Sequence, residues 1–501
     1  MADQLVRCAR LDKQLRELSA SCTIFHPDAR GLRASLRDGC ESAILKDLAL
    51  SKRKGVDRLL WSAVFYKPIE EFRRRLTCGA QDDVTEKVQV AGEAFLDEAY
   101  VFYVLLASKI QRVYGSVGLV QSLGPEDEAL VELAGAPRGE HSASPHADVE
   151  AAVCHCHVAM GDLLRYKTTM RTAGEVDWEA IERAYQTAAS IHAASGAPFN
   201  QLAVLATCRP APRDPLGAMY NYLRAMGATR PFPQSRANLV SLLRQLRRET
   251  DLSACPDVVS RAKLRCVLLL GIVWDDAGST MQSLERDMHA TLQDVTCWAD
   301  QLQHRCRQQA RRSLHSVPGV AEGRDAASTT PPPLVQLVVA LCHTMHAGQA
   351  AGGAGGWLSD LAWPLADALA GRCASLARSC PGSSAGLELV ASTWLLLAWL
   401  QSGVCRRRGC MVERHQGVRM PGLAGLAGHG LVLRPGPARS LQPVLPLDWV
   451  LRECEPLQHA YAPLCLDMAA GVQTEAAALP LYWQRLHDAA AAALGMLTGA
   501  D

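Results

Sequence analysis

Apolar residues recur at helical spacing, every three to four positions, along almost the whole chain, and no stretch alternates apolar and polar residues as a half-buried strand does. Aromatic residues make up only 5 % of the chain, whereas Ala and Leu are abundant, and this composition also favours helices over sheets. We therefore predict an all-α fold. The expected helices, before a last one over Leu479–Leu497, are Leu36–Asp47, Asp57–Leu76, Ala91–Tyr114, Val149–Thr169, Trp178–Ser195, Gln201–Thr207, Pro215–Ala228, Ser235–Arg248 and Val258–Asp275.

Three breaks interrupt this pattern. Residues 120–147 contain Gly-Pro, Ala-Pro-Arg-Gly and Ser-Pro and are expected to form a loop. Residues 316–333 are rich in Pro, Ser and Ala, and residues 405–446 in Gly and Pro, so both are expected to be linkers. With 501 residues the chain is too long for one ordinary core, and we expect two or three domains.

The N-terminal half contains an internal repeat. AYQTAASIHAASGAPFNQLAVL and MYNYLRAMGATRPFPQSRANLV superpose with Tyr185 on Tyr220 and Pro198 on Pro233. The offset of 35 residues is close to the 34-residue period of tetratricopeptide (TPR) helix pairs. Such pairs bury their apolar faces only by stacking, which forms a solenoid with a concave groove. The repeat therefore predicts a surface of the kind that binds peptides.

The charges are arranged in blocks, although the net charge is only +1. Residues 31–78 carry eleven basic and six acidic side chains, and residues 201–270 carry eleven basic and four acidic ones. Residues 81–130 have the opposite balance, nine acidic against three basic. This distribution indicates either a polarised surface that attracts an anionic partner or a set of solvated helix faces.

Several possible sites are excluded or disfavoured by the sequence. The four residues of CHCH (Cys154–His157) point apart on a helix, and the loop around Cys405, Cys410 and His415 lacks a fourth ligand. GGAGG lacks the Lys-Ser/Thr of a phosphate-binding loop, and no nucleophile–base pair stands out. We therefore expect no metal, no cofactor and no catalysis.

The location is expected to be a reducing compartment, the cytoplasm and the nucleus. The first residues, MADQLVRCAR, are polar and charged rather than a secretory signal, and the 18 cysteines are scattered through apolar helical stretches as free thiols are. The longest apolar run, Leu389–Leu400, is shorter than the roughly 18–20 residues that a membrane span needs, so no membrane association is expected.

Three stretches have a residue order more specific than helical periodicity. They are RLLWSAVFYKPIEEFRRRL (Arg58–Leu76), HCHVAMGDLLRYK (His155–Lys167) and ASGAPFNQLAVLAT (Ala194–Thr207), the last followed by YNYLRAM and RPFPQSRANL. Together they resemble the telomerase-activating "ever shorter telomeres" proteins and the related SMG adaptors of nonsense-mediated mRNA decay. The resemblance spans roughly residues 30–250.

The resemblance implies an architecture. Residues 1–250 would form a 14-3-3-like, TPR-like helical solenoid that binds phosphoserine, and residues 251–501 a C-terminal domain of antiparallel helical hairpins. Some family members carry a C-terminal nuclease domain with clustered acidic residues. Here no βαβ pattern and no cluster of strand-end aspartates is present, so a metal-dependent nuclease is not expected.

The resemblance also implies a phosphopeptide site at Lys67, Arg74, Arg165, Tyr166 and Asn200. Lys67 and Arg74 lie two helical turns apart on one face, and Arg165–Tyr166 matches the Arg-Tyr pair of a second helix. Four donors from two helices, left unneutralised, would suit the charge of about −1.5 to −2 on a phosphoserine.

Structural roles for the same residues stay open. Glu70–Arg74 and Glu71–Arg75 have the spacing of ordinary surface pairs, Tyr166 fits a core aromatic, and Asn200 fits a capping and packing role. Pro68 directly follows Lys67 and tends to kink a helix, so an alternative is that Lys67 does not reach the phosphate.

The function implied by the resemblance is that of a non-catalytic adaptor. Its partner would be a phosphorylated serine on the RNA helicase of nonsense-mediated decay, with dimerisation with a family paralogue as a further option. The alternative is a telomerase-associated subunit that uses the basic residues 201–270 to bind telomerase RNA or telomeric single-stranded DNA.

Overall fold

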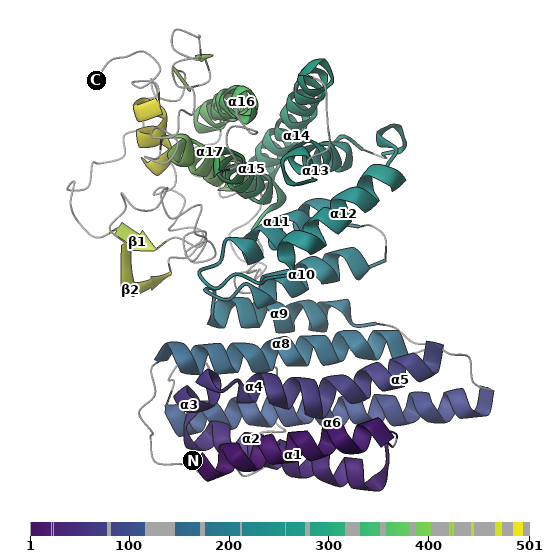
Figure 1. Cartoon of the computed structure of the whole chain (residues 1–501). Coiled ribbons are helices and arrows are strands. Elements are labelled where there is room, and N and C mark those ends of the chain that lie inside the picture. The colour runs from purple at the N-terminus through teal and green to yellow at the C-terminus, as the bar shows by residue number, and fades with distance from the viewer. Residues whose placement is uncertain are drawn as a thin grey trace. The chain divides into compact units, whose positions relative to one another are not determined.

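The computed structural model divides the chain into two compact units, unit 1 (Met1–Leu202) and unit 2 (Ala203–Asp501) (Figure 1). The boundary lies 48 residues before the expected division after residue 250, and it falls inside a helix rather than in a linker. The structure describes residues 2–21, 23, 25–77, 82–115, 146–170, 176–210, 213–255, 257–275, 281–315, 331–350, 357–379, 387–401, 420–421, 423–424, 442–444, 466–472 and 484–493. Most of the expected loop and most of the two expected linkers lie outside them, whereas residues 146–147 of the loop are helical.

Unit 1 is a stack of helices in which chain neighbours pack against each other, α1 on α2, α6 on α8 and α8 on α9 (Figure 1). Its elements are α1 (Ala2–Ser21), α2 (Pro27–Lys46), α3 (Leu48–Arg53), α4 (Val56–Leu59), the π-helical turn η1 (Leu60–Tyr66), α5 (Lys67–Thr77), α6 (Asp82–Tyr114), α8 (His146–Met170), α9 (Trp178–Ile191) and the first part of α10 (Ala197–Cys208). The helices α1 and α3 were not expected from the sequence. The helices that were expected in this region are all present.

Two of the connections in unit 1 are fixed by polar side chains. Asp47 caps α3 by accepting a hydrogen bond from the backbone N–H of Leu50, and Asp177 caps α9 in the same way through Ala180. The hydroxyl of Tyr114, at the end of α6, accepts from the N–H of Leu48 and donates to the carbonyl of Ile44, both over 3.0 Å. The α2–α3 turn is therefore tied to the long helix α6.

The helix over residues 56–77 changes its hydrogen-bond register just before Pro68. In η1 the bonds span five residues, so the N–H of Lys67 donates to the carbonyl of Ser62, and α5 then begins with Lys67 and Pro68. Proline has no N–H to donate and is tolerated in a first helical turn. The register change thus accommodates Pro68 without ending the helical segment, and it leaves Lys67 on the surface.

The repeat predicted from the sequence corresponds to two helix pairs, α9–α10 and α11 (Pro215–Met226)–α12 (Ser235–Glu249). The two matched tyrosines hold equivalent buried positions, since Tyr185 and Tyr220 are 0 % and 2 % exposed. The two matched prolines lie at or just before the start of the second helix of each pair.

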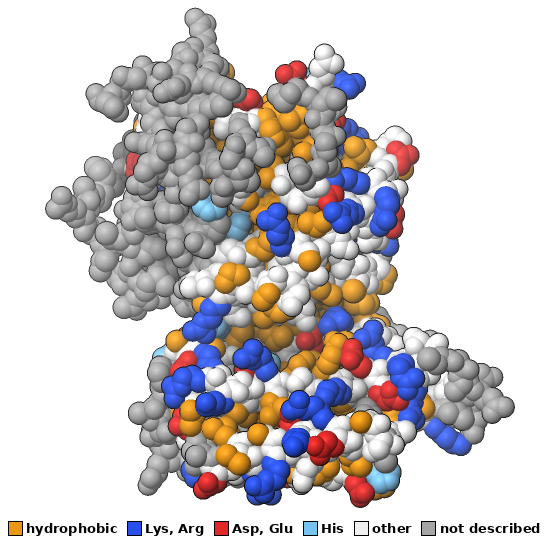
Figure 2. All heavy atoms as spheres, in the orientation of Figure 1, with side chains coloured by type: hydrophobic (Ala, Val, Ile, Leu, Met, Phe, Trp, Pro, Cys, Tyr) orange, Lys and Arg blue, Asp and Glu red, His pale blue; other side chains and the backbone are white. Residues whose placement is uncertain are grey.

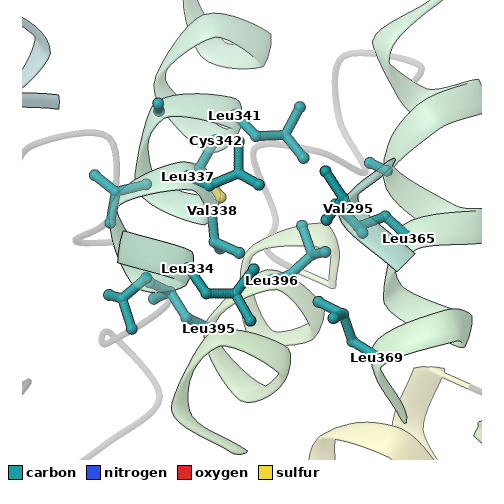
Figure 3. Close-up of a cluster of buried hydrophobic side chains, with 14 of the residues drawn as sticks. Val295, Leu334, Leu337, Val338, Leu341, Cys342, Leu365, Leu369, Leu395 and Leu396 are labelled. Carbon is teal, nitrogen blue, oxygen red and sulfur yellow. The ribbon is translucent and has the colours of Figure 1, made fainter. Parts of the chain in front are cut away.

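Unit 2 continues with helices that bury one apolar core (Figure 3). They are the rest of α10, α11, α12, the 3-10 turn η3 (Leu252–Ala254), α13 (Val258–Asp275), α14 (Met281–His315), α15 (Pro333–Ala350), α16 (Leu358–Ser379), α17 (Leu387–Leu400) and a helix over 484–493. Four of these helices meet in one cluster, to which Val295 of α14, Leu341 of α15, Leu365 of α16 and Leu396 of α17 belong (Figure 3).

The apolar run at Leu389–Leu400 lies within α17 and belongs to this core, with Leu395, Leu396 and Leu397 fully buried. No helix in the described part of the chain has both the length and the apolar character that a membrane span requires. The only strands among the described residues are a short parallel pair, β1 (Gln442–Val444) and β2 (Leu466–Val472). The expected all-α fold is confirmed, with this strand pair as a minor addition.

Candidate functional site

Two helices of unit 1, α5 and α8, meet around the ring of Tyr166. The guanidinium carbon of Arg73, from α5, lies 5.4 Å from the ring centroid of Tyr166, and that of Arg165, from α8 itself, lies 4.7 Å from it. Tyr66 adds a second aromatic ring, with its centroid 6.3 Å from that of Tyr166. Cations over aromatic faces are attracted by the ring quadrupole, so Tyr166 holds two guanidinium groups of different helices close together.

The two α5 residues predicted for the site differ in their surroundings. Lys67 is exposed and forms no ion pair with any described residue. Arg74, also exposed, binds Glu71 with two hydrogen bonds, from Nε over 2.8 Å and from Nη2 over 2.7 Å. Arg73, between them in the chain, has no carboxylate partner among the described residues.

Glu71 is the carboxylate that organises this end of α5. It accepts from Arg75 over 2.8 Å as well as from Arg74, and these bonds together lower the pKa of Glu71 despite its partial burial. The predicted Glu71–Arg75 pair is therefore confirmed. The predicted Glu70–Arg74 pair is wrong, because Glu70 instead accepts a hydrogen bond of 2.6 Å from the Tyr66 hydroxyl. That bond and burial raise the pKa of Tyr66 to about 12.

Arg165 is held by a carboxylate of its own helix. Its Nη2 donates to Asp162 Oδ1 over 2.9 Å and its Nε to the hydroxyl of Tyr185 over 3.2 Å. Burial works against the charged form of Arg165, but Asp162 and Tyr185 more than offset it and raise the pKa of the guanidinium. Arg165 is therefore a fixed and locally neutralised cation.

The same carboxylate connects Arg165 with Asn200. Asp162 Oδ1 also accepts from Tyr185 over 2.8 Å and from the side-chain amide of Gln201, whose own oxygen accepts from Asn200 Nδ2 over 3.2 Å. Asn200 is only 3 % exposed and is the fourth residue of α10, so it does not cap the helix. Its role in the structure is packing and hydrogen bonding inside unit 1.

Gly161 explains why the hydrogen bonds around Asp162 can form. A Cβ at position 161 would lie 2.5 Å from Cε1 of Tyr185, closer than any real contact, so α9 reaches α8 here only because residue 161 has no side chain. The stretch GDLLRY thus supplies, in order, the close approach at Gly161, the acceptor Asp162, the donor Arg165 and the buried ring of Tyr166.

The structure corrects the prediction of an unneutralised set of donors. Arg74 and Arg165 are each paired with a carboxylate, and burial is the main cause that raises the pKa of Tyr166, as expected for a core aromatic. Sequence reasoning missed Arg73, whose position one residue before Arg74 places it next to Tyr166. It also missed Asp162, although an aspartate three residues before an arginine is a recognisable helical pair.

The basic segment of unit 2 is neutralised to a large extent as well. Asp275 binds both Arg244 and Arg247, over 2.8 and 2.6 Å, and Asp294 binds both Arg261 and Arg265, each over 2.9 Å. The cations Arg236, Arg248 and Lys263 form no ion pair within the described residues, although Arg236 lies 5.7 Å from the ring centroid of Trp274. The net charge counted along the sequence therefore overstates the number of unpaired cations.

The chemistry that the α5–α8 residues offer is hydrogen-bond donation and positive charge. Metal ligation is a different matter: across the parts of the chain that the structure describes, no group of three or more His, Cys, Asp or Glu side chains is placed to hold an ion.

Comparison with known families identifies two regions of the chain. Residues 55–171 match the family described as telomerase activating protein Est1, and residues 182–265 match the Est1 DNA/RNA binding domain. The chain is 31 % identical over 245 residues to nonsense-mediated mRNA decay factor SMG7-like of Arabidopsis thaliana, an alignment that covers 48 % of this chain and 24 % of the relative.

Two further relatives give similar values. Over 243 residues the chain is 30 % identical to nonsense-mediated mRNA decay factor SMG5 of Homo sapiens, covering 46 % of this chain and 22 % of the relative. Over 220 residues it is 28 % identical to telomerase-binding protein EST1A of Danio rerio, an alignment that covers 44 % of this chain and 13 % of the relative. The matched part of the chain therefore spans less than a quarter of the length of these curated relatives.

Two solved structures share the fold. One, a crystal structure of Est1 and Cdc13, superposes with a TM-score of 0.65 at 13 % identity and covers 99 % of this chain and 96 % of its own. The other, the SMG5–SMG7 complex of C. elegans, superposes with a TM-score of 0.54 at 14 % identity. This match covers 96 % of this chain and 99 % of the matched chain. At these identities the match establishes the arrangement of helices.

Proposed function

We propose, since residues 55–171 and 182–265 match two Est1 family models, that this chain is a non-catalytic adaptor of nonsense-mediated mRNA decay that binds serine-phosphorylated proteins. Its expected partner is the phosphorylated RNA helicase of that pathway, and its expected location is the cytoplasm and the nucleus. The observation that carries the proposal is the placement of Arg73 and Arg165, from two helices, over one Tyr166 ring.

Positive charge for the phosphate comes from α5 in this proposal. A phosphoserine carries about −1.5 to −2 charge and three acceptor oxygens, and Lys67 and Arg73 have no carboxylate to compete with it among the described residues. Arg74 is the third cation. Glu71 is also paired with Arg75, so it keeps a countercharge when Arg74 turns to a ligand. Breaking the Arg74–Glu71 pair costs little, because an exposed ion pair contributes only about 0.2–1 kcal/mol.

Arg165 and Tyr166 act in this proposal as a rigid wall beside the phosphate. Asp162 cancels the charge of Arg165 but also fixes the direction of its guanidinium, which reduces the conformational entropy lost when a ligand binds. Asn200 takes part indirectly, since it orients Gln201 and through it Asp162. The ligand contacts are thus assigned to Lys67, Arg73, Arg74 and Arg165.

Fluorescence anisotropy with a labelled phosphoserine peptide of the helicase and its unphosphorylated twin tests this assignment. The double variant Arg73→Ala/Arg74→Ala is expected to weaken phosphopeptide binding about a hundredfold, because each charge-assisted hydrogen bond contributes about 1.5–3 kcal/mol. Arg30→Ala, at an exposed cation on α2, is the matched control and should leave the affinity unchanged. Equal affinity of the wild type for the two peptides would reject the proposal.

Nucleic-acid binding by unit 2 is the second candidate function, favoured by the match of residues 182–265 to an Est1 DNA/RNA binding domain. The ligand would be telomerase RNA or telomeric single-stranded DNA, bound by cations such as Arg236, Arg248 and Lys263 that form no ion pair among the described residues. A labelled single-stranded oligonucleotide in the same anisotropy assay separates the two functions, because only nucleic-acid binding weakens steeply with salt and ignores peptide phosphorylation.

A family paralogue is a further proposed partner. The support is that a solved structure with this fold is a complex of two proteins named SMG5 and SMG7. Sedimentation of the chain alone and mixed with each of its paralogues tests the pairing, and a chain that sediments as a monomer in every mixture would exclude it.

A further inference from the structure

The helix α5 ends in an accessible hydroxyl group that follows three arginines, in the order Arg73, Arg74, Arg75, Leu76, Thr77. Thr77 is exposed, and its Oγ1 donates to the carbonyl oxygens of Arg73 and Arg74 over 3.1 and 3.0 Å. These carbonyls belong to the last turn of the helix, where water can serve as their partner instead. The hydroxyl of Thr77 is therefore open to chemical modification without loss of a buried contact.

The order of these residues matches the substrate pattern of arginine-directed protein kinases. Such kinases select a serine or threonine by two arginines, two and three residues before it, which bind carboxylates of the kinase. Arg74 and Arg75 have this spacing to Thr77. The order Arg-Arg-x-Ser or Arg-Arg-x-Thr occurs at one other place in the chain, residues 247–250.

A kinase binds its substrate as an extended segment, so the last turn of α5 has to open. The contacts that hold this turn are few and lie near the surface. Arg74 and Arg75 share the carboxylate of Glu71, and the guanidinium carbon of Arg75 lies 4.6 Å from the ring centroid of Phe25. Ion pairs of this kind contribute little, and helix ends fray, so the opening is accessible.

The second Arg-Arg-x-Thr, at the end of α12, is a poorer substrate. Its Arg247 is half-buried and paired with Asp275 over 2.6 Å. Two carboxylates, those of Glu249 and Asp251, also flank Thr250 directly in the chain. They repel the acidic groups with which a kinase binds arginines. Thr250 thus provides an internal comparison for Thr77.

A phosphate on Thr77 would lie between the two α5 arginines that we assign to phosphoserine. At about 100° per residue, Thr77 is rotated by about 40° from Arg73 and by about 60° from Arg74, in opposite directions around the helix. Residues three and four apart are neighbours on a helix surface, and helical side chains lean towards the N-terminus. Figure 2 shows Lys and Arg side chains on the part of unit 1 where Figure 1 draws α5.

The surrounding charges favour such a phosphate. Arg73 has no carboxylate partner among the described residues, and Glu71 keeps Arg75 as a partner when Arg74 turns away. The dipole of α5 opposes a negative group at its C-terminus, but with only about half an elementary charge. Two guanidinium groups outweigh it and match the charge of about −1.5 to −2 on the phosphate.

We propose that Thr77 is a phosphorylation site for an arginine-directed protein kinase, and that its phosphate pairs with Arg73 and Arg74 and blocks the phosphoserine site. In the transfer, Thr77 Oγ1 attacks the γ-phosphorus of ATP, the bond from this phosphorus to the bridging oxygen of ADP breaks, and the hydroxyl proton is released. The blocking rests on the proposed function, whereas the modification and the pairing do not. A phosphate within the same chain competes at a high effective concentration.

The modification is tested by incubating the full chain with MgATP and the catalytic subunit of cAMP-dependent protein kinase. Mass spectrometry of the digested chain then follows phosphate at Thr77 and at Thr250 over time. Thr77 is expected to react at least about tenfold faster, because its arginines have no acidic residue next to the acceptor. Phosphate incorporation at Thr77 that is absent, or no faster than at Thr250, would overturn the proposal.

The pairing is tested by phosphorus NMR of the phosphorylated Thr250→Val variant, which carries the Thr77 phosphate alone. Nearby cations favour the doubly charged form and so lower the second pKa of the phosphate. Arg73→Ala in the same background keeps Arg74 and Arg75 for the kinase and should raise this pKa. An unchanged pKa would contradict the pairing.

The blocking is tested by fluorescence anisotropy with the labelled phosphoserine peptide. Phosphorylated Thr250→Val is expected to bind the peptide about tenfold more weakly than the same variant before phosphorylation, since its cations are occupied and the two phosphates repel each other. Thr77→Val, treated with the same kinase, should keep its affinity. Equal affinity before and after phosphorylation would overturn the blocking. If the unmodified chain does not prefer the phosphopeptide, the proposed function fails, and mass spectrometry and NMR still decide the modification and the pairing.

Discussion

Gly161 lies directly against the ring of Tyr185 where α8 packs on α9, since a Cβ on Gly161 would meet that ring at 2.5 Å. The approach brings the Tyr185 hydroxyl to 2.8 Å from Asp162, and through Asp162 it fixes Arg165. The absence of a side chain at Gly161 thereby determines where Arg165 lies in the proposed phosphoserine site.

Gly161→Ala is expected to destabilise the protein by about 1–3 kcal/mol, because the buried Tyr185 ring has to move and its hydrogen bonds with it. Chemical denaturation followed by circular dichroism measures the change. Gly31→Ala is the matched control, since a Cβ at Gly31, on α2, meets nothing within 4 Å. Alanine in a helix is favoured over glycine by up to about 1 kcal/mol, so this control should be neutral or stabilising.

Asp162→Asn is expected to cost about 3 kcal/mol of stability, because it leaves the largely buried Arg165 without a countercharge. Combining it with Arg165→Gln should recover part of the loss, and the double-mutant cycle measures the coupling between the two. Asp97→Asn, which breaks the exposed pair with Lys167, is the comparison and should cost no more than about 1 kcal/mol. Equal costs for the two aspartates would contradict the buried network.

The buried His157 is expected to make the fold sensitive to acid. Burial lowers the pKa of its imidazole from 6.5 to about 4, so between these values the unfolded chain binds a proton that the folded chain does not. Stability is therefore lost as the pH falls, by about 2 kcal/mol from this residue between pH 7 and pH 5. Denaturation curves across this range should show a shallower pH dependence for His157→Gln, whereas His146→Gln, on the exposed surface of the same helix, should keep the wild-type slope.

The ion pairs in unit 2 predict which cations contribute to the salt dependence of binding if single-stranded nucleic acid binds there. Removing Arg236, Arg248 and Lys263 together should reduce the slope of log K against log salt by about 2, at about 0.7 for each phosphate that is no longer neutralised. Arg244→Ala is the control, because Arg244 is already paired with Asp275, and Asp275 keeps Arg247 as a partner in this variant. The slope should therefore change little. A larger change in slope for Arg244→Ala than for the triple variant would show that the ion pairs open on binding.

The helices of the described regions could be predicted from the sequence because helical periodicity is a local property. The expected helix over Val258–Asp275 coincides with α13, and the matched Tyr185 and Tyr220 are equivalent in two helix pairs. The helix α1 was missed although it is as long as α2. The π-helical turn before Pro68 was not foreseen either, since its register depends on how the whole segment packs.

The order of the amino acids was enough to establish the helical fold, the repeat and which segments carry an excess of positive charge. Which of those charges are neutralised, and which residues meet, depends on how the helices pack. Lys167 pairs with Asp97 and Arg261 with Asp294, partners 70 and 33 residues apart, and helical spacing contains no information about such distant pairs. A pocket in unit 1 has the same origin, because the residues that line it come both from the segment α2 to η1 and from the distant helices α6 and α8.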